Sequence, residues 1–234
     1  MYWISIPLTR SRTRYGGPVA VDFAGAQVGV MGFGASPAEL AAWSALPIET
    51  VIDRLLNYES QSTDHDVKIG DPNYLGITTQ SGQPFSPNTL INDARQRWLF
   101  RMTHSQRPLE EKMALFWHNH FTSALNKVNR PELMYRQTAL FRTNALGNFE
   151  KFLKATAKDP AMLVYLDTNS NKASAPNENY ARELMELFTL GEGRGYTELD
   201  VREAARAFTG WRVQVGDRTG WKIDGLQHDG GVKT

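Results

Sequence analysis

Cysteine is missing from the 234-residue chain. Its absence excludes disulfide bonds, thiolate nucleophiles and the zinc sites that cysteine builds, and it leaves the redox compartment open. The chain also lacks any run approaching the roughly 18 apolar residues that a transmembrane helix needs, so we expect no membrane span. Hydrophobic residues make up 41% of the chain, which is enough for an ordinary globular core.

A large excess of charge of one sign is also lacking, because 26 basic residues face 25 acidic ones. Proteins that bind nucleic acid usually gather a basic stripe. The densest basic grouping here is Arg95, Arg97 and Arg101, on one expected helix. We therefore expect no nucleic-acid partner, whereas a protein partner or a polysaccharide stays open.

The N-terminal 30 residues give no clear structural signal. Three arginines at positions 10, 12 and 14 precede an apolar stretch, but Asp22, Gln27 and several glycines interrupt it. This pattern does not match an export signal. We treat residues 1–30 as a poorly defined segment.

From residue 31 the pattern is helical almost throughout. Ser36 and Glu39 form a capping box around Pro37, and Pro47 opens a second helix with its apolar residues on one face. A long polar loop is expected at 60–88. Further helices are expected at 89–102, 108–121, 131–146, 148–158, 161–166, 177–190 and 197–211.

The last residues favour a β-hairpin. Val213–Val215 and Trp221–Ile223 flank a turn signal at Gly216-Asp217. The predicted fold is therefore mainly α, a single domain of roughly eight helices at 31–212 with a short hairpin-like or irregular tail at 213–234.

The helix at 108–121 carries two of the five histidines. A helical wheel places His120 on an arc with the apolar residues Leu109, Met113, Phe116 and Trp117. His118 falls on the other side, near Glu111, because residues i and i+2 do not share a helix face. We therefore expect His120 to point inward.

The helix at 177–190 carries an acidic stripe with one arginine. Glu178, Arg182, Glu183 and Glu186 share an arc, and Arg182 is spaced i,i+4 from both Glu178 and Glu186. The arginine can thus bridge two carboxylates.

Two functional hypotheses follow. In the first, the helices at 108–121 and 177–190 form the walls of a hydrolase-like site, with His120, Glu183 and Arg182 as catalytic groups. A divalent metal ion would be held there by ligands from the set His118, His120, Glu178, Glu183 and Glu186. No Glu-x-x-His motif of the di-iron type occurs in the chain, however.

In the second hypothesis, the domain is a non-catalytic helical module that binds a protein partner or an extracellular polymer. The acidic stripe is then a solvated face held by ion pairs, and His120 is a buried core histidine. Trp221, in the tail, is the tryptophan best placed for contact with carbohydrate.

Several long motifs, taken together and in order, resemble the bacterial domain-of-unknown-function family 1800. They are PLEEKMALFWHNHF (Pro108 to Phe121), ALGNF (Ala145 to Phe149), DPAMLVYLD (Asp159 to Asp167), PNENYARELMELFTLG (Pro176 to Gly191) and YTELDVREAARAFTGW (Tyr196 to Trp211). GFGAS (Gly32 to Ser36) and HDGGVK (His228 to Lys233) also resemble segments of that family.

The resemblance implies a mainly helical fold and an exported protein, with no known reaction. Members of the family are commonly much longer, so the resemblance also implies that this chain is a fragment.

Overall fold

The computed structural model describes residues 31–62, 85–214 and 220–234. This part of the chain forms ten α-helices, three short helices of other types and one two-stranded antiparallel sheet. The predicted mainly-α fold with a C-terminal hairpin is therefore confirmed. Among the described helices, none combines the length and apolar character needed to cross a bilayer. The predicted segment 1–30 and most of the predicted loop at 60–88 lie outside the described residues.

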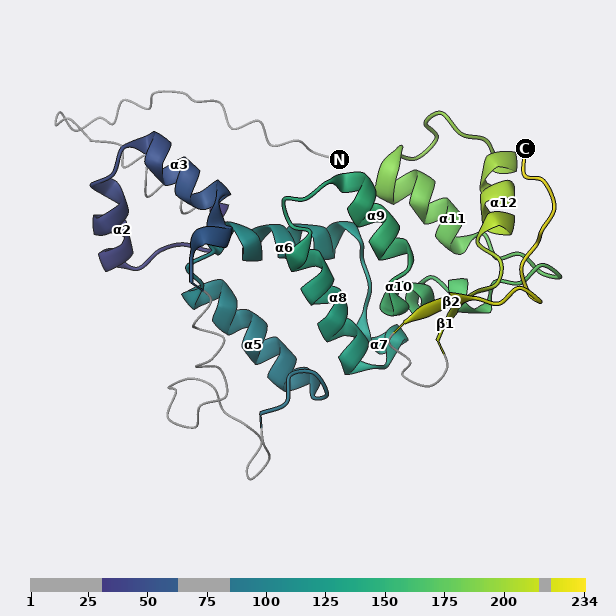
Figure 1. The fold of residues 1–234 in the computed structure, drawn as a ribbon, viewed down its shortest axis with the longest axis horizontal. Helices are drawn as coiled ribbons and strands as arrows, with labels where there is room; N and C mark the ends of the chain where they lie inside the picture. The colour runs from purple at the N-terminus through teal and green to yellow at the C-terminus, as the bar shows by residue number, and fades with distance from the viewer. Residues whose placement is uncertain (1–30, 63–84, 215–219) are drawn as a thin grey trace.

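The α-helices follow one another along the chain and across the molecule. In order they are α2 (Pro37–Ser44), α3 (Ile48–Leu56), α5 (Ile91–His104), α6 (Pro108–His120), α7 (Leu125–Val128), α8 (Pro131–Thr143), α9 (Phe149–Ala157), α10 (Pro160–Tyr165), α11 (Asn179–Glu183) and α12 (Glu198–Ala207). Figure 1 shows α2 and α3 at one end, α6 and α8 in the middle, and α11, α12 and the hairpin at the other end. The short helix α7 was not anticipated from the sequence.

Side-chain caps explain where several of these helices begin. The capping box at Ser36 is present, and Thr197 and Asp200 form a second one at α12. Asn148 and Asp159 each accept a backbone N–H at the start of α9 and α10. These caps satisfy N–H groups that a helix start leaves without partners.

An aromatic cluster holds the centre of the molecule together. Phe121, Phe141 and Phe152 are almost completely buried, with ring centroids 5.2–6.0 Å apart. Trp117 packs against the cluster, and its indole N–H donates to the carbonyl of Ala145 at 2.8 Å. Because these residues come from the end of α6, from α8 and from α9, their burial fixes the three segments against one another.

The expected orientation of α6 is partly wrong. Phe116, expected inside, is 53% exposed, whereas Glu111, expected on the polar side, is completely buried. The buried face of this helix runs through Leu109, Glu110, Glu111 and Ala114. A helical wheel predicts the buried face from where the apolar side chains fall, so it cannot anticipate a carboxylate that is buried with a cationic partner.

The cationic partners of Glu111 come from the neighbouring helices. Together these residues form a buried charge cluster, which consists of Arg101, Glu110, Glu111 and Arg142. Glu111 accepts from Arg101 Nε at 2.5 Å and from Arg142 Nε at 2.8 Å. Arg101 also donates to Glu110 at 3.1 Å, and burial, followed by the nearby Glu111, raises the pKa of Glu110. The cluster therefore joins α5, α6 and α8 through charge-assisted hydrogen bonds.

A second buried polar feature links the α6–α7 turn to α8 and α10. The Ser123 hydroxyl donates to the side-chain carbonyl of Gln137, whose amide N–H donates to Asp159 Oδ2 at 2.7 Å. Asp159 Oδ2 also accepts the backbone N–H of Met162 at 3.0 Å. Burial raises the pKa of Asp159 from 3.8 to about 6. We call this chain of hydrogen bonds the Ser–Gln–Asp relay.

The hairpin pairs β1 (Trp211–Val213) with β2 (Trp221–Ile223), and Trp211 lies opposite Ile223. The first strand thus begins two residues before the predicted Val213 and is described to Val213, whereas Val215 lies outside the described residues. The predicted Gly216-Asp217 turn lies outside the described residues.

The charge cluster predicts a large cost for Glu111→Gln. The substitution keeps the shape of the side chain but leaves Arg101 and Arg142 buried without their shared carboxylate. Removing one partner of a buried ion pair costs about 3 kcal/mol or more. We expect the urea concentration at the midpoint of unfolding to fall clearly, as measured by circular dichroism.

The matched control for this substitution is Glu150→Gln. Glu150 pairs with Lys154 on the surface, where both side chains are mostly exposed, and such pairs contribute little. The control should unfold at the wild-type midpoint. Equal midpoints for Glu111→Gln and the control would show that the buried cluster contributes nothing to stability.

The relay predicts a pH-dependent effect of Asp159→Asn. Because folding raises the pKa of Asp159, the folded protein holds a proton on this carboxyl at pH values where the unfolded chain has lost it. The stability that this protonation contributes is lost as pH rises from about 4 to about 6. Asparagine keeps the N-cap oxygen but does not ionise. We expect the variant to gain on the wild type by up to about 3 kcal/mol across that range. Unfolding free energies measured between pH 4 and pH 8 test this, and a constant difference would contradict it.

Candidate functional site

The two segments singled out from the sequence do meet, at His120. Its Nε2 lies 3.2 Å from the carbonyl oxygen of Phe188. The imidazole also packs edge-to-face against Trp117 and Phe121, with centroids 5.6 and 4.7 Å away. His120 is therefore embedded in the rim of the aromatic cluster, with one ring nitrogen directed at the backbone of the second segment.

Arg182 clamps the acidic stripe. It donates to Glu178 at 3.0 Å and to Glu186 at 3.4 Å, as the spacing predicts. Glu198 of α12 adds two further contacts at 2.9 and 2.8 Å, which no local sequence pattern indicates. Glu198 first and Glu178 second raise the pKa of Arg182. The guanidinium thus joins α11 to α12.

Glu183 differs from the other glutamates of the stripe. Among the described residues it takes part in no ion pair with a lysine or arginine. Partial burial, followed by the nearby Glu186, raises its pKa. The surroundings of Glu183 therefore favour its protonated form.

The segment after Glu183 departs from the regular α-helix that the sequence predicts. Leu184–Thr189 forms a π-helix (labelled η3), which directly follows α11. The Thr189 hydroxyl donates to the carbonyl of Leu184 at 2.6 Å, and the backbone N–H groups of Leu190 and Gly191 both reach the carbonyl of Met185. The wider turn shifts every later residue around the axis, so a wheel misplaces side chains beyond Glu183. Leu187, which a regular α-helix would place opposite the acidic stripe, is 58% exposed.

The predicted metal ligands are not brought together. In the described part of the chain, no three histidine, aspartate or glutamate side chains form a group that could hold a metal ion. Glu178 and Glu186 already face the Arg182 guanidinium, which competes with a cation for the same oxygens. His118 lies in a different environment from His120, against Trp98 and Phe141. The donor set therefore does not fit a divalent ion in this arrangement.

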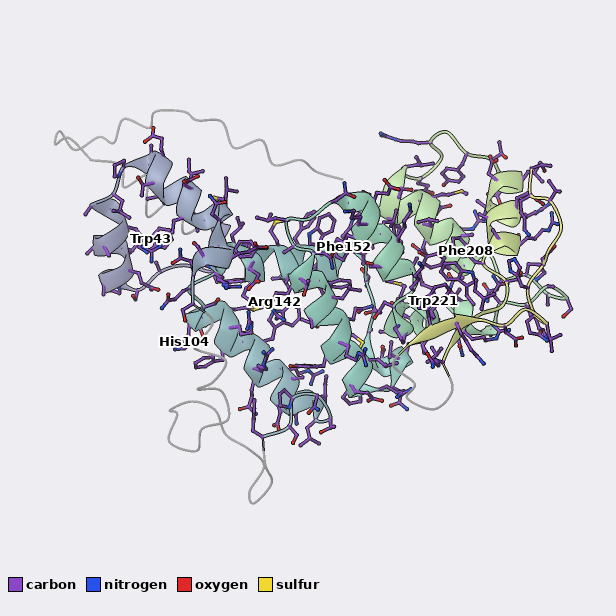
Figure 2. The ribbon with its side chains drawn as sticks, viewed as in Figure 1. Trp43, His104, Arg142, Phe152, Phe208 and Trp221 are labelled. Carbon is purple, nitrogen blue, oxygen red and sulfur yellow. The ribbon has the colours of Figure 1, made fainter. Side chains whose placement is uncertain are left out.

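His118 instead lines a cavity of about 310 Å³ between α5 and α8, which we call the α5–α8 cavity. The turn after α6 and the start of α7 complete its wall. The lining residues are Ile91, Ala94, Arg95, Arg97, Trp98, His118, Ser123, Ala124, Leu125, Met134, Tyr135, Thr138 and Arg142. Figure 2 shows Arg142 near the middle of the molecule, well away from the hairpin that carries Trp221.

Two polar atoms in this wall are buried without a partner. They are Trp98 Nε1 and His118 Nδ1, and neither has a hydrogen bond to any described residue. The two rings meet edge to face, with centroids 5.3 Å apart. Burial lowers the pKa of His118, so its imidazole is neutral at neutral pH. Buried polar atoms are rarely left unpaired, so each of these two nitrogens calls for an explanation.

The charged side chains that line the cavity are all basic. Three arginines line the cavity, and among the described lining residues none is acidic. Arg97 lies over the ring of Tyr135 at 5.5 Å, and Arg142 is held by Glu111. Because Glu111 offsets the charge of Arg142, Arg95 and Arg97 are the arginines whose interaction with a bound anion is open to test.

The sequence contained one clue to this site, the Arg95, Arg97 and Arg101 grouping. It was weighed only as a nucleic-acid signal. Arg101 turns out to be buried in the charge cluster, while Arg95 and Arg97 line the cavity. His118 was included among the metal ligands, but it was assigned to the polar side of its helix. Only the packing of α5 against α8 brings these residues together.

Comparison with known proteins adds one finding. No curated protein and no solved structure matches the chain. The family model described as "Protein of unknown function (DUF1800)" matches residues 28–234. The match covers nearly the whole chain, and the protein therefore belongs to the DUF1800 family.

Proposed function

We propose that this domain is a binding module that takes up an anionic organic molecule in the α5–α8 cavity. The observation that carries the proposal is that two residues lining one cavity with three arginines, Trp98 and His118, each bury a ring nitrogen that has no hydrogen-bond partner. An indole N–H can only donate, so it calls for an acceptor oxygen on the ligand.

The charge of the cavity selects for an anion. Arg95 is exposed at the rim, and it forms no ion pair with any residue in the described part of the chain. A guanidinium group recognises carboxylate and phosphate oxygens through two parallel hydrogen bonds. With no acidic side chain in the described wall, an anionic ligand meets no like charge there.

The remaining wall is apolar and suits a ligand with a hydrocarbon or aromatic body. Ile91, Leu125 and Met134 supply aliphatic surface, and Tyr135 supplies a ring. Ligand sites are typically concave and mostly apolar, with a few converging polar groups. An organic acid combines the two features, and so does the acidic end group of an extracellular polymer.

The metal-dependent hydrolase built on His120, Arg182 and Glu183 has less support. Arg182 occupies the carboxylates of Glu178 and Glu186, and His120 uses one ring nitrogen against the Phe188 backbone.

The proposal is tested by isothermal titration calorimetry of the full chain with phenylacetate and with its neutral isostere phenylacetamide. We expect phenylacetate to bind more tightly, because only its carboxylate pairs with the arginines. Trp98→Phe keeps an aromatic ring but removes the indole donor. It should weaken phenylacetate binding about tenfold, since a hydrogen bond to a charged group contributes roughly 1.5 kcal/mol.

Trp43→Phe is the matched control, because Trp43 packs against α3 in the separate N-terminal cluster. Arg95→Gln should weaken binding of phenylacetate and not of phenylacetamide. Its matched control is Arg194→Gln, because Arg194 is exposed in the loop before α12 and does not line the cavity. If neither compound binds, or if both bind equally and Trp98→Phe behaves like Trp43→Phe, the cavity is not an anion site.

A further inference from the structure

We infer that the ligand of the α5–α8 cavity carries a hydrogen-bond donor beside its anionic group, and that the Ser123 hydroxyl oxygen accepts it. This inference rests on the proposed function, because it concerns the chemistry of the same ligand. It assigns Ser123 as a residue that determines specificity and Gln137 as the residue that positions it.

The geometry of the Ser–Gln–Asp relay supports this assignment. Ser123 is 5% exposed, Gln137 is fully buried and Asp159 is 7% exposed, so water does not compete for their hydrogen bonds. Ser123 lines the cavity, while Asp159 lies at the far end of the relay, at the start of α10. The relay thus runs from the cavity wall into the core.

Asp159 fixes the direction of every hydrogen bond in the relay. An ionised carboxylate only accepts, so Gln137 must turn its amide N–H toward Asp159 and its carbonyl toward Ser123. The single proton of the Ser123 hydroxyl is then committed to Gln137. What Ser123 can offer to the cavity is a lone pair.

Apart from the neutral imidazole of His118 and the hydroxyl of Tyr135, the other polar side chains of the wall are mainly donors. The arginines and the Trp98 indole have no acceptor atom. Thr138 has its hydroxyl proton committed to the carbonyl of Met134 at 2.9 Å. A ligand with only acceptor atoms would therefore leave the hydroxyl oxygens of Ser123 and Thr138 unused. An acid that also carries a hydroxyl or amino group satisfies both kinds of partner.

The test uses calorimetry at pH 8, where the carboxylate of Asp159 is ionised. The ligands are phenylacetate, its 2-, 3- and 4-hydroxy derivatives and mandelate. Each of the four hydroxy acids carries its single hydroxyl at a different position of the same skeleton. We expect at least one hydroxy acid to bind about fivefold more tightly than phenylacetate, as one neutral hydrogen bond predicts. In Ser123→Ala this preference should vanish, while phenylacetate affinity stays unchanged.

Thr138→Val is the matched control, because it removes the other hydroxyl of the wall and keeps the side-chain volume. It should preserve the preference. Gln137→Met, which releases the Ser123 proton, should let the O-methyl ether of the preferred hydroxy acid bind as well as that acid. Circular dichroism checks that this variant folds, and Ser123→Ala carries the test if it does not.

The outcomes separate the two proposals. If no acid binds, the proposed function fails. If phenylacetate binds and no hydroxy derivative binds better, the anion site stands and this inference is overturned. A preference that survives Ser123→Ala but disappears in Thr138→Val also overturns it, because the acceptor is then Thr138.

Discussion

One carboxylate, that of Glu111, determines how the central helices can pack. It is fully buried, and it accepts from Arg101 of α5 and Arg142 of α8. Burying an unpaired carboxylate is so unfavourable that the docking of α6 depends strongly on these two arginines. Through Arg142 the charge cluster also contributes to the wall of the α5–α8 cavity.

Features that depend on neighbours in sequence could be predicted. The capping box at Ser36 and the helix starts at Pro108 and Pro131 are local, and so is the bridge from Arg182 to Glu178 and Glu186. Each requires only residues within one helical turn. The fold class followed from these signals and from the apolar periodicity between them.

Features that depend on distant partners could not be predicted. Nothing within a turn of Glu111 shows that Arg142, 31 residues later, will reach it. The π-helix after Glu183 likewise has no sequence signature, yet it changes which side chains face the core beyond that point. The candidate site differs from the predicted one for the same reason. His118 belongs to the predicted metal-ligand set, but its neighbours Trp98 and Arg142 come from helices that meet it only in the folded chain.

The difference between His118 and His120 shows why the cavity is the better place to look for function. His120 has a partner in the Phe188 carbonyl and a complete aromatic environment, so the fold itself accounts for it. His118 and Trp98 each bury a polar nitrogen without a partner, at a cost of about 1–3 kcal/mol per group. Two such costs at one cavity, beside arginines with no acid in the described wall, are not explained by stability. In the proposed function, an oxygen of the ligand accepts from Trp98 Nε1 and the negative charge of the ligand pairs with Arg95.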